Sequence, residues 1–125
     1  MKNILLLAVL FSFISCSAKK QSLFYAFTDG FMDWYELKLF HDSSFDLHIP
    51  SVDYSGFYRI DGDSIFLSYK EKQTGDIPQA YLINTKKQKI DELILFEGTY
   101  IIRQDNNRWI QIVNNNLPND KKKPQ

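Results

Sequence analysis

Short runs that alternate apolar and polar residues recur every eight to twelve residues through most of this chain, and turn-forming residues separate them. Alternation with a period of two is typical of a β-strand with one face in a core. After residue 22 no stretch repeats its apolar residues with the 3.6-residue period of a helix. The sequence therefore predicts an all-β protein. The expected strands are Ser22–Thr28, Asp33–Phe40, Ser44–Ile49, Tyr54–Ile60, Ser64–Lys70, Gln79–Thr85, Lys89–Phe96, Thr99–Gln104 and Arg108–Val113.

The length and charge of the chain restrict the fold further. It has 125 residues, 15 basic and 15 acidic, so it lacks the excess of basic residues that nucleic-acid binding requires. Because 44% of its residues are hydrophobic, disorder over the whole length is excluded. One domain of this size with eight or nine short strands is expected to be a single antiparallel barrel or half-barrel.

The register of the second and third expected strands follows from two criteria. Pairing Leu39 with Phe45 gathers the apolar residues of both strands on one face. The same register sets Glu36 opposite His48 on the other face, where the two side chains are expected to pair.

A second hairpin is predicted around Gly62, which supplies the positive φ that a two-residue turn requires. Its register pairs Tyr58 with Leu67 toward the core and leaves Phe57 and Phe66 on the opposite face. The last three strands are more apolar, and we expect them to be buried on both faces.

The sequence carries no pattern of catalytic or metal-binding chemistry. His41 falls in a turn, and His48 lies roughly 13 Å along the following strand, too far for both to bind one metal ion. A Gly-x-Ser-x-Gly elbow and a glycine-rich phosphate loop are absent, and the acidic residues fall mainly at turns. We therefore expect no enzyme activity, no metal and no cofactor.

The first residues have the layout of an export signal, in which Lys2 precedes the apolar run Ile4–Ile14. That run is shorter than the roughly 20 residues that span a membrane. The junction Phe13-Ile14-Ser15-Cys16 resembles the signal of bacterial lipoproteins, which are cut before the cysteine. The resemblance implies that Cys16 begins the mature chain and carries acyl groups such as palmitate, which attach the protein to the lipid bilayer.

The residues after this junction indicate a location. By resemblance to lipoprotein sorting, Ser17 implies the outer membrane, and the absence of an acidic run implies its periplasmic face. The expected organisation is a signal peptide at 1–15, a lipidated tether at 16–22, a β-barrel at 23–113 and a disordered tail at 114–125.

The segment from Gly56 to Tyr69 resembles a hairpin of small lipocalin-like lipoproteins of the Bacteroidetes type, in which Gly-x-Tyr-x-Ile meets Asp-Gly-Asp-x-Ile-x-Leu. The resemblance covers this hairpin alone. It implies a lipocalin-like antiparallel barrel or half-barrel that either binds small or apolar molecules or has no assigned role, and no catalytic residue carries over from the family.

Two functions follow from these expectations. A roomy interior lined by Tyr35 and Tyr58 would bind a small apolar ligand. A filled barrel with Trp34, Phe57 and Phe66 exposed would instead bind an envelope protein, as an inhibitor, an immunity protein or a subunit of an envelope complex does. These five aromatic residues are the candidate binding residues.

Overall fold

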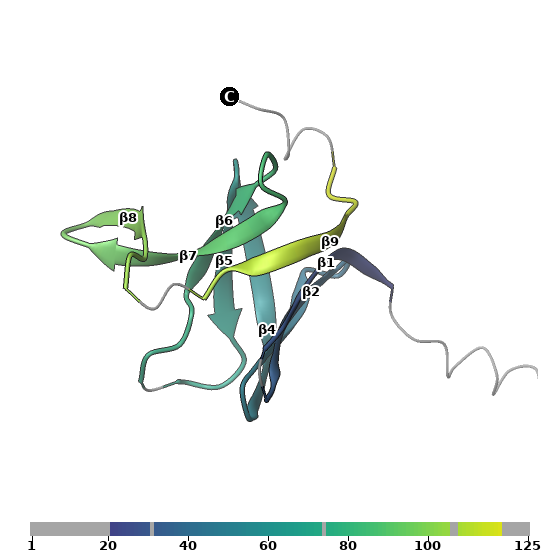
Figure 1. Cartoon of the computed structure of the whole chain (residues 1–125), viewed down its shortest axis with the longest axis horizontal. Helices are drawn as coiled ribbons and strands as arrows, with labels where there is room; N and C mark the ends of the chain where they lie inside the picture. Colours follow the sequence, from purple (N-terminus) through teal and green to yellow (C-terminus); the bar gives the residue numbers. More distant parts are fainter. Residues whose placement is uncertain (1–20, 31, 74, 106–107, 119–125) are drawn as a thin grey trace, which may run out of the picture.

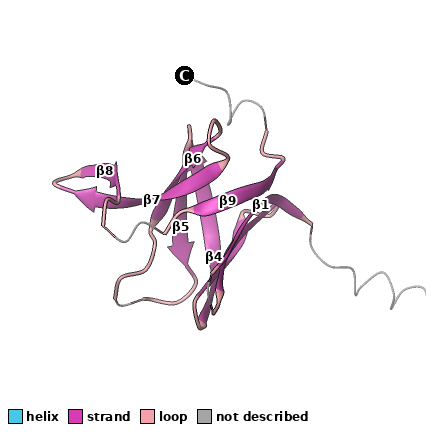
Figure 2. Cartoon of the chain, in the orientation of Figure 1, coloured by secondary structure: helices cyan, strands magenta, loops and turns pink. Residues whose placement is uncertain are grey.

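The computed structural model describes residues 21–30, 32–73, 75–105 and 108–118, and within these ranges it contains strands and no helix (Figure 2). The all-β prediction is confirmed, and most strand bounds differ from the expected ones by one or two residues. The strands are β1 (Ser22–Asp29), β2 (Trp34–Phe40), β3 (Ser44–Ile49), β4 (Val52–Asp61), β5 (Ser64–Tyr69), β6 (Ala80–Asn84), β7 (Lys89–Phe96), β8 (Thr99–Ile102) and β9 (Ile110–Asn115).

The strands form one closed antiparallel barrel (Figure 1). Neighbours pair in the order β6-β5-β4-β3-β2-β1-β9-β7-β8, and β6 also pairs with β7. This last pairing closes eight strands into a ring and leaves β8 as an additional strand on β7. The predicted single barrel of eight or nine strands is confirmed, and it is closed rather than half-open.

β8 and β9 lie along the same edge of β7. Leu93 of β7 pairs with Ala80 of β6 on one side and with Ile102 of β8 on the other. Further back along β7, Ile90 pairs with Ile110 of β9. β8 ends at Ile102 and β9 begins at Ile110 on the same edge of β7, so β8 and β9 are two halves of one interrupted strand.

Both predicted hairpin registers are confirmed. Leu39 lies opposite Phe45 in the β2–β3 pair, and Tyr58 lies opposite Leu67 in the β4–β5 pair. Gly62 has a φ of 61° in the turn between β4 and β5, as the tight hairpin requires.

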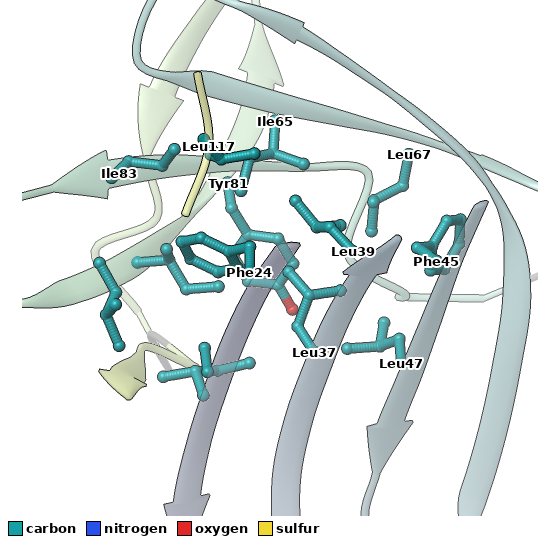
Figure 3. Close-up of a cluster of buried hydrophobic side chains, with 14 residues drawn as sticks. Phe24, Leu37, Leu39, Phe45, Leu47, Ile65, Leu67, Tyr81, Ile83 and Leu117 are labelled. Atoms are coloured by element: carbon teal, nitrogen blue, oxygen red, sulfur yellow. The ribbon is translucent and has the colours of Figure 1, made fainter. Parts of the chain in front are cut away.

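Inward-facing side chains fill the barrel (Figure 3). The buried ones come from every strand of the ring except β4, whose Tyr54, Tyr58 and Ile60 pack against them partly buried. Phe24, Leu37 and Tyr81 lie near the middle of the cluster in this view. The interior is therefore packed with side chains rather than roomy. The buried cluster consists of Phe24, Ala26, Leu37, Leu39, Phe45, Leu47, Ile65, Leu67, Tyr81, Ile83, Ile90, Ile110, Ile112 and Leu117.

The folded part of the chain ends later than the sequence predicted. β9 continues to Asn115, and Leu117 is 3% exposed within the core cluster, so the expected boundary at Val113 falls too early. Cys16 and most of the expected tether lie outside the described residues, as do residues 119–125. No described segment forms a helix long and apolar enough to cross a membrane.

Candidate functional site

Three aromatic side chains and one arginine lie together on the outer face of β4, β5 and β8. Phe57 and Arg59 are two residues apart on β4, so their side chains leave the same face. Arg59 lies opposite Phe66 of β5, and its guanidinium carbon is 4.3 Å from the centre of the Phe66 ring. The Phe66 ring meets the Tyr100 ring edge to face, with 5.2 Å between centroids. We call Phe57, Arg59, Phe66 and Tyr100 the aromatic strip.

The aromatic strip has the composition and exposure of a protein-binding surface. Phe57 is 61% exposed and Tyr100 is 42% exposed, while Phe66 is half-buried between its two neighbours. Stacked aromatic and arginine side chains lose little freedom when they bind, and both types are enriched among residues that dominate interface energies.

The strip continues onto a hairpin that projects from the barrel (Figure 1), made by residues 94–102 of β7 and β8, which we call the arm. Its apolar residues Leu95, Phe96, Tyr100 and Ile101 are between 40% and 62% exposed. The prediction that these strands are buried on both faces is wrong for β9, where Ile110 and Ile112 are buried but Val113 is 59% exposed, and it is wrong for the arm. The physical reason is that β6 pairs with β7 only as far as Leu93, so the rest of β7 extends beyond the barrel wall.

The arm ends in a two-residue turn. Glu97 and Gly98 have φ values of 50° and 81°, the left-handed conformation that a type I′ turn needs at both positions. Leu95 then pairs with Tyr100, and Ile94 pairs with Ile101. Between Ile94 and Ile102, Glu97 is the only charged residue of the sequence.

A buried charge network lies where the β8–β9 edge is interrupted. Glu92 is 1% exposed and lies opposite Tyr81, which belongs to the core. Arg108 donates to both carboxylate oxygens of Glu92 at 2.7 Å, and Arg103 donates to one of them at 3.2 Å. Arg103 also donates to both oxygens of Asp76, at 2.8 and 2.7 Å.

This network balances two arginines against two acidic side chains. The hydrogen bond from Arg103 holds the pKa of Asp76 below its ordinary value. The hydrogen bonds to Asp76 and Glu92 raise the pKa of Arg103, and those to Glu92 raise the pKa of Arg108. Because Arg103 follows β8, Arg108 precedes β9 and Asp76 lies in the β5–β6 loop, the network fastens these three residues to β7.

One feature of the sequence, the position of Glu92, indicates a buried charge. Glu92 stands in an apolar strand two residues after Ile90, so period-two alternation places its side chain on the core face. A carboxylate in that position requires cationic partners. Their identity depends on where the fold places Arg103 and Arg108, which no local pattern predicts.

His48 lies in a second cluster. Its Nε2 atom is 2.9 Å from a carboxylate oxygen of Asp33, and its Nδ1 atom is 2.7 Å from one of Asp53. Its ring stacks on Trp34, with 4.0 Å between centroids and 16° between planes. The backbone N–H of Ser51 also donates to Asp33, at 2.6 Å, so the cluster ties the start of β2 to the β3–β4 turn.

The predicted side-chain pair of His48 with Glu36 is wrong, although the register that suggested it is right. The carboxylate of Glu36 accepts a hydrogen bond from the Tyr25 hydroxyl at 2.8 Å. The nitrogens of His48 bond to Asp33 and Asp53 instead. Asp33 precedes the first residue of β2, so the cross-strand pairs of the β2–β3 ladder do not include it.

We expect a thermal stability that depends on the protonation of His48. The hydrogen bonds to Asp33 and Asp53 raise the pKa of His48 above its ordinary value of 6.5. A protonated ring donates to both carboxylates, whereas a neutral ring donates to one. The stabilisation is therefore complete below pH 6.5 and is lost as the pH rises through the pKa of the folded state.

Thermal melts at constant ionic strength test this dependence. The Tm of the unaltered protein is expected to fall as the pH is raised above 6.5. His48→Gln is expected to remove most of this slope of Tm against pH. A slope of the same size in His48→Gln would show that other groups cause it.

The predicted binding residues do not form one surface. Phe57 and Phe66 lie together in the aromatic strip, but Trp34 stacks on His48. Asp53, the residue opposite His48 in the ladder, precedes Phe57 by four positions on β4, roughly 13 Å. Trp34 therefore lies apart from the strip.

Tyr35 and Tyr58 face the core, as predicted, and are half-buried against it. The Tyr58 hydroxyl donates to the backbone carbonyl of Phe40 at 2.7 Å. Tyr58 also lines an open hollow of about 450 Å³ with His41 and Leu117. Tyr35 lies near the other end of the barrel, so the two tyrosines do not line a common cavity.

Over the described ranges, no three His, Cys, Asp or Glu side chains are placed to hold a metal ion. The fold and site define a closed antiparallel β-barrel with an exposed aromatic strip and a projecting arm. A scan against protein-family models and searches of curated proteins and of solved structures gave no match to this chain.

Proposed function

We propose that this protein is a lipid-anchored protein of the bacterial envelope that binds a protein partner through its aromatic strip. The observation that carries the proposal is the exposure of Phe57 beside Arg59, Phe66 and Tyr100 on a barrel whose interior is filled. An exposed row of aromatic side chains around an arginine is suited to docking a protein surface.

The other function expected from the sequence, storage of a small apolar ligand inside the barrel, has less support. A ligand pocket of a useful size occupies about 300 Å³ or more. Core side chains occupy the barrel centre, and the hollow beside Tyr58 is open and includes the polar residues His41, Ser43 and Arg59.

The direction of the arm supports a protein partner rather than the lipid bilayer. β1 begins on the side of the molecule opposite the arm (Figure 1). If Cys16 carries the lipid, the five residues before Ser22 reach roughly 20 Å at most. Such a short tether holds the start of β1 near the membrane, so the arm and the adjoining strip face away from it.

Site-specific photocrosslinking in living cells tests this proposal. We expect a photoreactive phenylalanine analogue at position 57 of the full chain to form an adduct with a distinct envelope protein. The same analogue at Val113, which is 59% exposed on β9, is expected to form none. Arg59→Ala is expected to lower the adduct at position 57 at least fivefold with little change in Tm, because its side chain is exposed.

Two results would contradict the proposal. One is the same adduct from positions 57 and 113, and the other is an adduct that Arg59→Ala leaves unchanged. Cys16→Ser tests the anchor separately, because it is expected to release the protein from the membrane fraction. Retention of the variant in that fraction would contradict the lipid attachment but not the binding surface.

A further inference from the structure

We propose that the aromatic strip binds an extended segment of the partner protein, in which a carboxylate side chain pairs with Arg59 and an apolar side chain four residues away fills a hollow beside Tyr100. This inference rests on the proposed function, and it adds the chemistry by which the strip would recognise its partner.

Arg59 has no carboxylate partner within the described part of the chain. The protein has three arginines, and the other two, Arg103 and Arg108, bond to Glu92 in the buried network. Asp61 lies two positions after Arg59 on the same face of β4, but no ion pair joins the two side chains. Because Arg59 is exposed, a partner can reach its guanidinium and supply the missing carboxylate.

The guanidinium of Arg59 is already held in place before a partner binds. It lies 4.3 Å from the centre of the Phe66 ring, and the Phe66 ring contacts the Tyr100 ring with 5.2 Å between centroids. A stacked guanidinium presents its N–H groups in a fixed plane, so it loses little conformational freedom when it pairs with a carboxylate. The same two contacts connect Arg59 to the hollow, because Tyr100 lines it.

The hollow has a volume of about 400 Å³ and lies between the arm and the β5–β6 loop (Figure 1). Its apolar lining includes Ile77 of the loop and Leu95 and Tyr100 of the arm. The acidic side chains that line it, Asp76 and Glu92, already bond to arginines of the buried network. The hollow therefore offers apolar surface without an unpaired charge, which favours an apolar side chain such as leucine.

The backbone at Leu95 indicates that the hollow receives a polypeptide. The pairing of β6 with β7 ends at Leu93, so no described strand pairs with the next residues of β7 on that side. The carbonyl of Glu92 accepts a hydrogen bond from the N–H of Arg103 on the opposite side of β7. Because backbone groups alternate in direction along a strand, the N–H and C=O of Leu95 point to the side that β6 has left. An extended peptide can bond to these groups.

The row of contacts also sets the spacing on the partner. It runs from Arg59 across the Phe66 and Tyr100 rings, which are separated by contacts of 4.3 and 5.2 Å, and ends in the hollow. Side chains four residues apart on one face of an extended segment lie roughly 13 Å from each other. That separation is long enough to cross both rings, so we expect four residues between the carboxylate and the apolar side chain.

Binding of three synthetic peptides to the full chain in detergent micelles tests this recognition. The first, acetyl-Thr-Glu-Thr-Ser-Thr-Leu-Thr-amide, carries glutamate and leucine four residues apart. The second has glutamine in place of glutamate, and the third has the composition of the first with glutamate next to leucine. We expect the first peptide to shift the backbone amide resonances of Arg59, Leu95 and Tyr100. The other two peptides are expected to bind at least fivefold more weakly.

Arg59→Gln shows whether the carboxylate pairs with this arginine. The substitution is expected to abolish the preference for the glutamate peptide over the glutamine peptide, with little change in Tm because the side chain is exposed. Val113→Gln, at an exposed position of β9, is the matched control and is expected to keep the full preference. Equal binding of the two peptides to the unaltered protein would contradict recognition of a carboxylate. A first peptide that shifts neither Arg59 nor Leu95 would overturn the site.

The adduct at position 57 distinguishes a failure of this recognition from a failure of the proposed function. In membranes isolated from the crosslinking strain, a saturating concentration of the glutamate peptide is expected to lower the adduct at least fivefold, whereas the glutamine peptide is not. An adduct that the glutamate peptide leaves unchanged would overturn the inferred chemistry while partner binding stands. Binding of the glutamate peptide without any adduct would contradict partner binding while the preference of the strip for a carboxylate stands.

Discussion

Replacing Glu92 with alanine is expected to lower the free energy of unfolding by about 3–5 kcal/mol, because it leaves buried guanidinium groups without their carboxylate. Glu92 is 1% exposed and accepts three hydrogen bonds from Arg103 and Arg108. The side chain of Arg108 is itself only 13% exposed, so water replaces the lost carboxylate poorly. Urea unfolding would show the change as a midpoint lowered by about 2 M at a typical slope.

Asp76→Ala is the matched control for this experiment. Asp76 bonds to Arg103 in the same network, but 64% of its side chain is exposed. Exposed ion pairs contribute about 1 kcal/mol or less, so the control is expected to lose no more than that. If Glu92→Ala lost no more stability than Asp76→Ala, the bonds from Arg103 and Arg108 to Glu92 would not contribute to the stability of the barrel.

A second large loss of stability is expected when Gly56, where β4 lies close to β5, is replaced by alanine. A Cβ atom on Gly56 would lie 2.1 Å from the backbone oxygen of Ser68 and 2.9 Å from a ring carbon of Phe45. The backbone oxygen cannot move without disturbing the β4–β5 ladder. We therefore expect Gly56→Ala to cost about 3 kcal/mol or more, measured by the same urea titration.

Gly62→Ala separates this steric effect from the effect of backbone conformation. A Cβ at Gly62 meets no atom within 4 Å, but the residue has a φ of +61°. The left-handed conformation costs about 1–2 kcal/mol for alanine, so we expect a smaller loss than at Gly56. A larger loss of stability in Gly62→Ala than in Gly56→Ala would show that the close contact between β4 and β5 tolerates a methyl group.

The barrel was predictable because its determinants are local and repeated. Period-two alternation locates the strands, and cross-strand pairing of Leu39 with Phe45 sets one register. A glycine turn sets the other register. Each of these features depends on residues within about 15 positions of one another, where sequence pattern and strand geometry agree.

The features that the sequence did not reveal depend on distant segments. The arm is exposed because the pairing of β6 with β7 ends at Leu93. The arginine partners of Glu92 lie between β8 and β9, where the strand pairing along the edge of β7 is interrupted. Leu117 completes the core from beyond the last strand, although it stands alone among polar residues. Apolar composition alone could not distinguish the exposed arm from a central strand.

The closure of the barrel also affects how the chain folds. β1 and β9 pair with each other, although they come from the two ends of the described chain. Closing a loop of that length is entropically unfavourable, and β-proteins with such non-local pairing fold in milliseconds to seconds rather than microseconds. During synthesis, the hairpins from β1 to β5 can form first, while β1 keeps an open edge. Folding can finish only after Asn115 has emerged, so the unpaired edge of β1 must avoid aggregation until then.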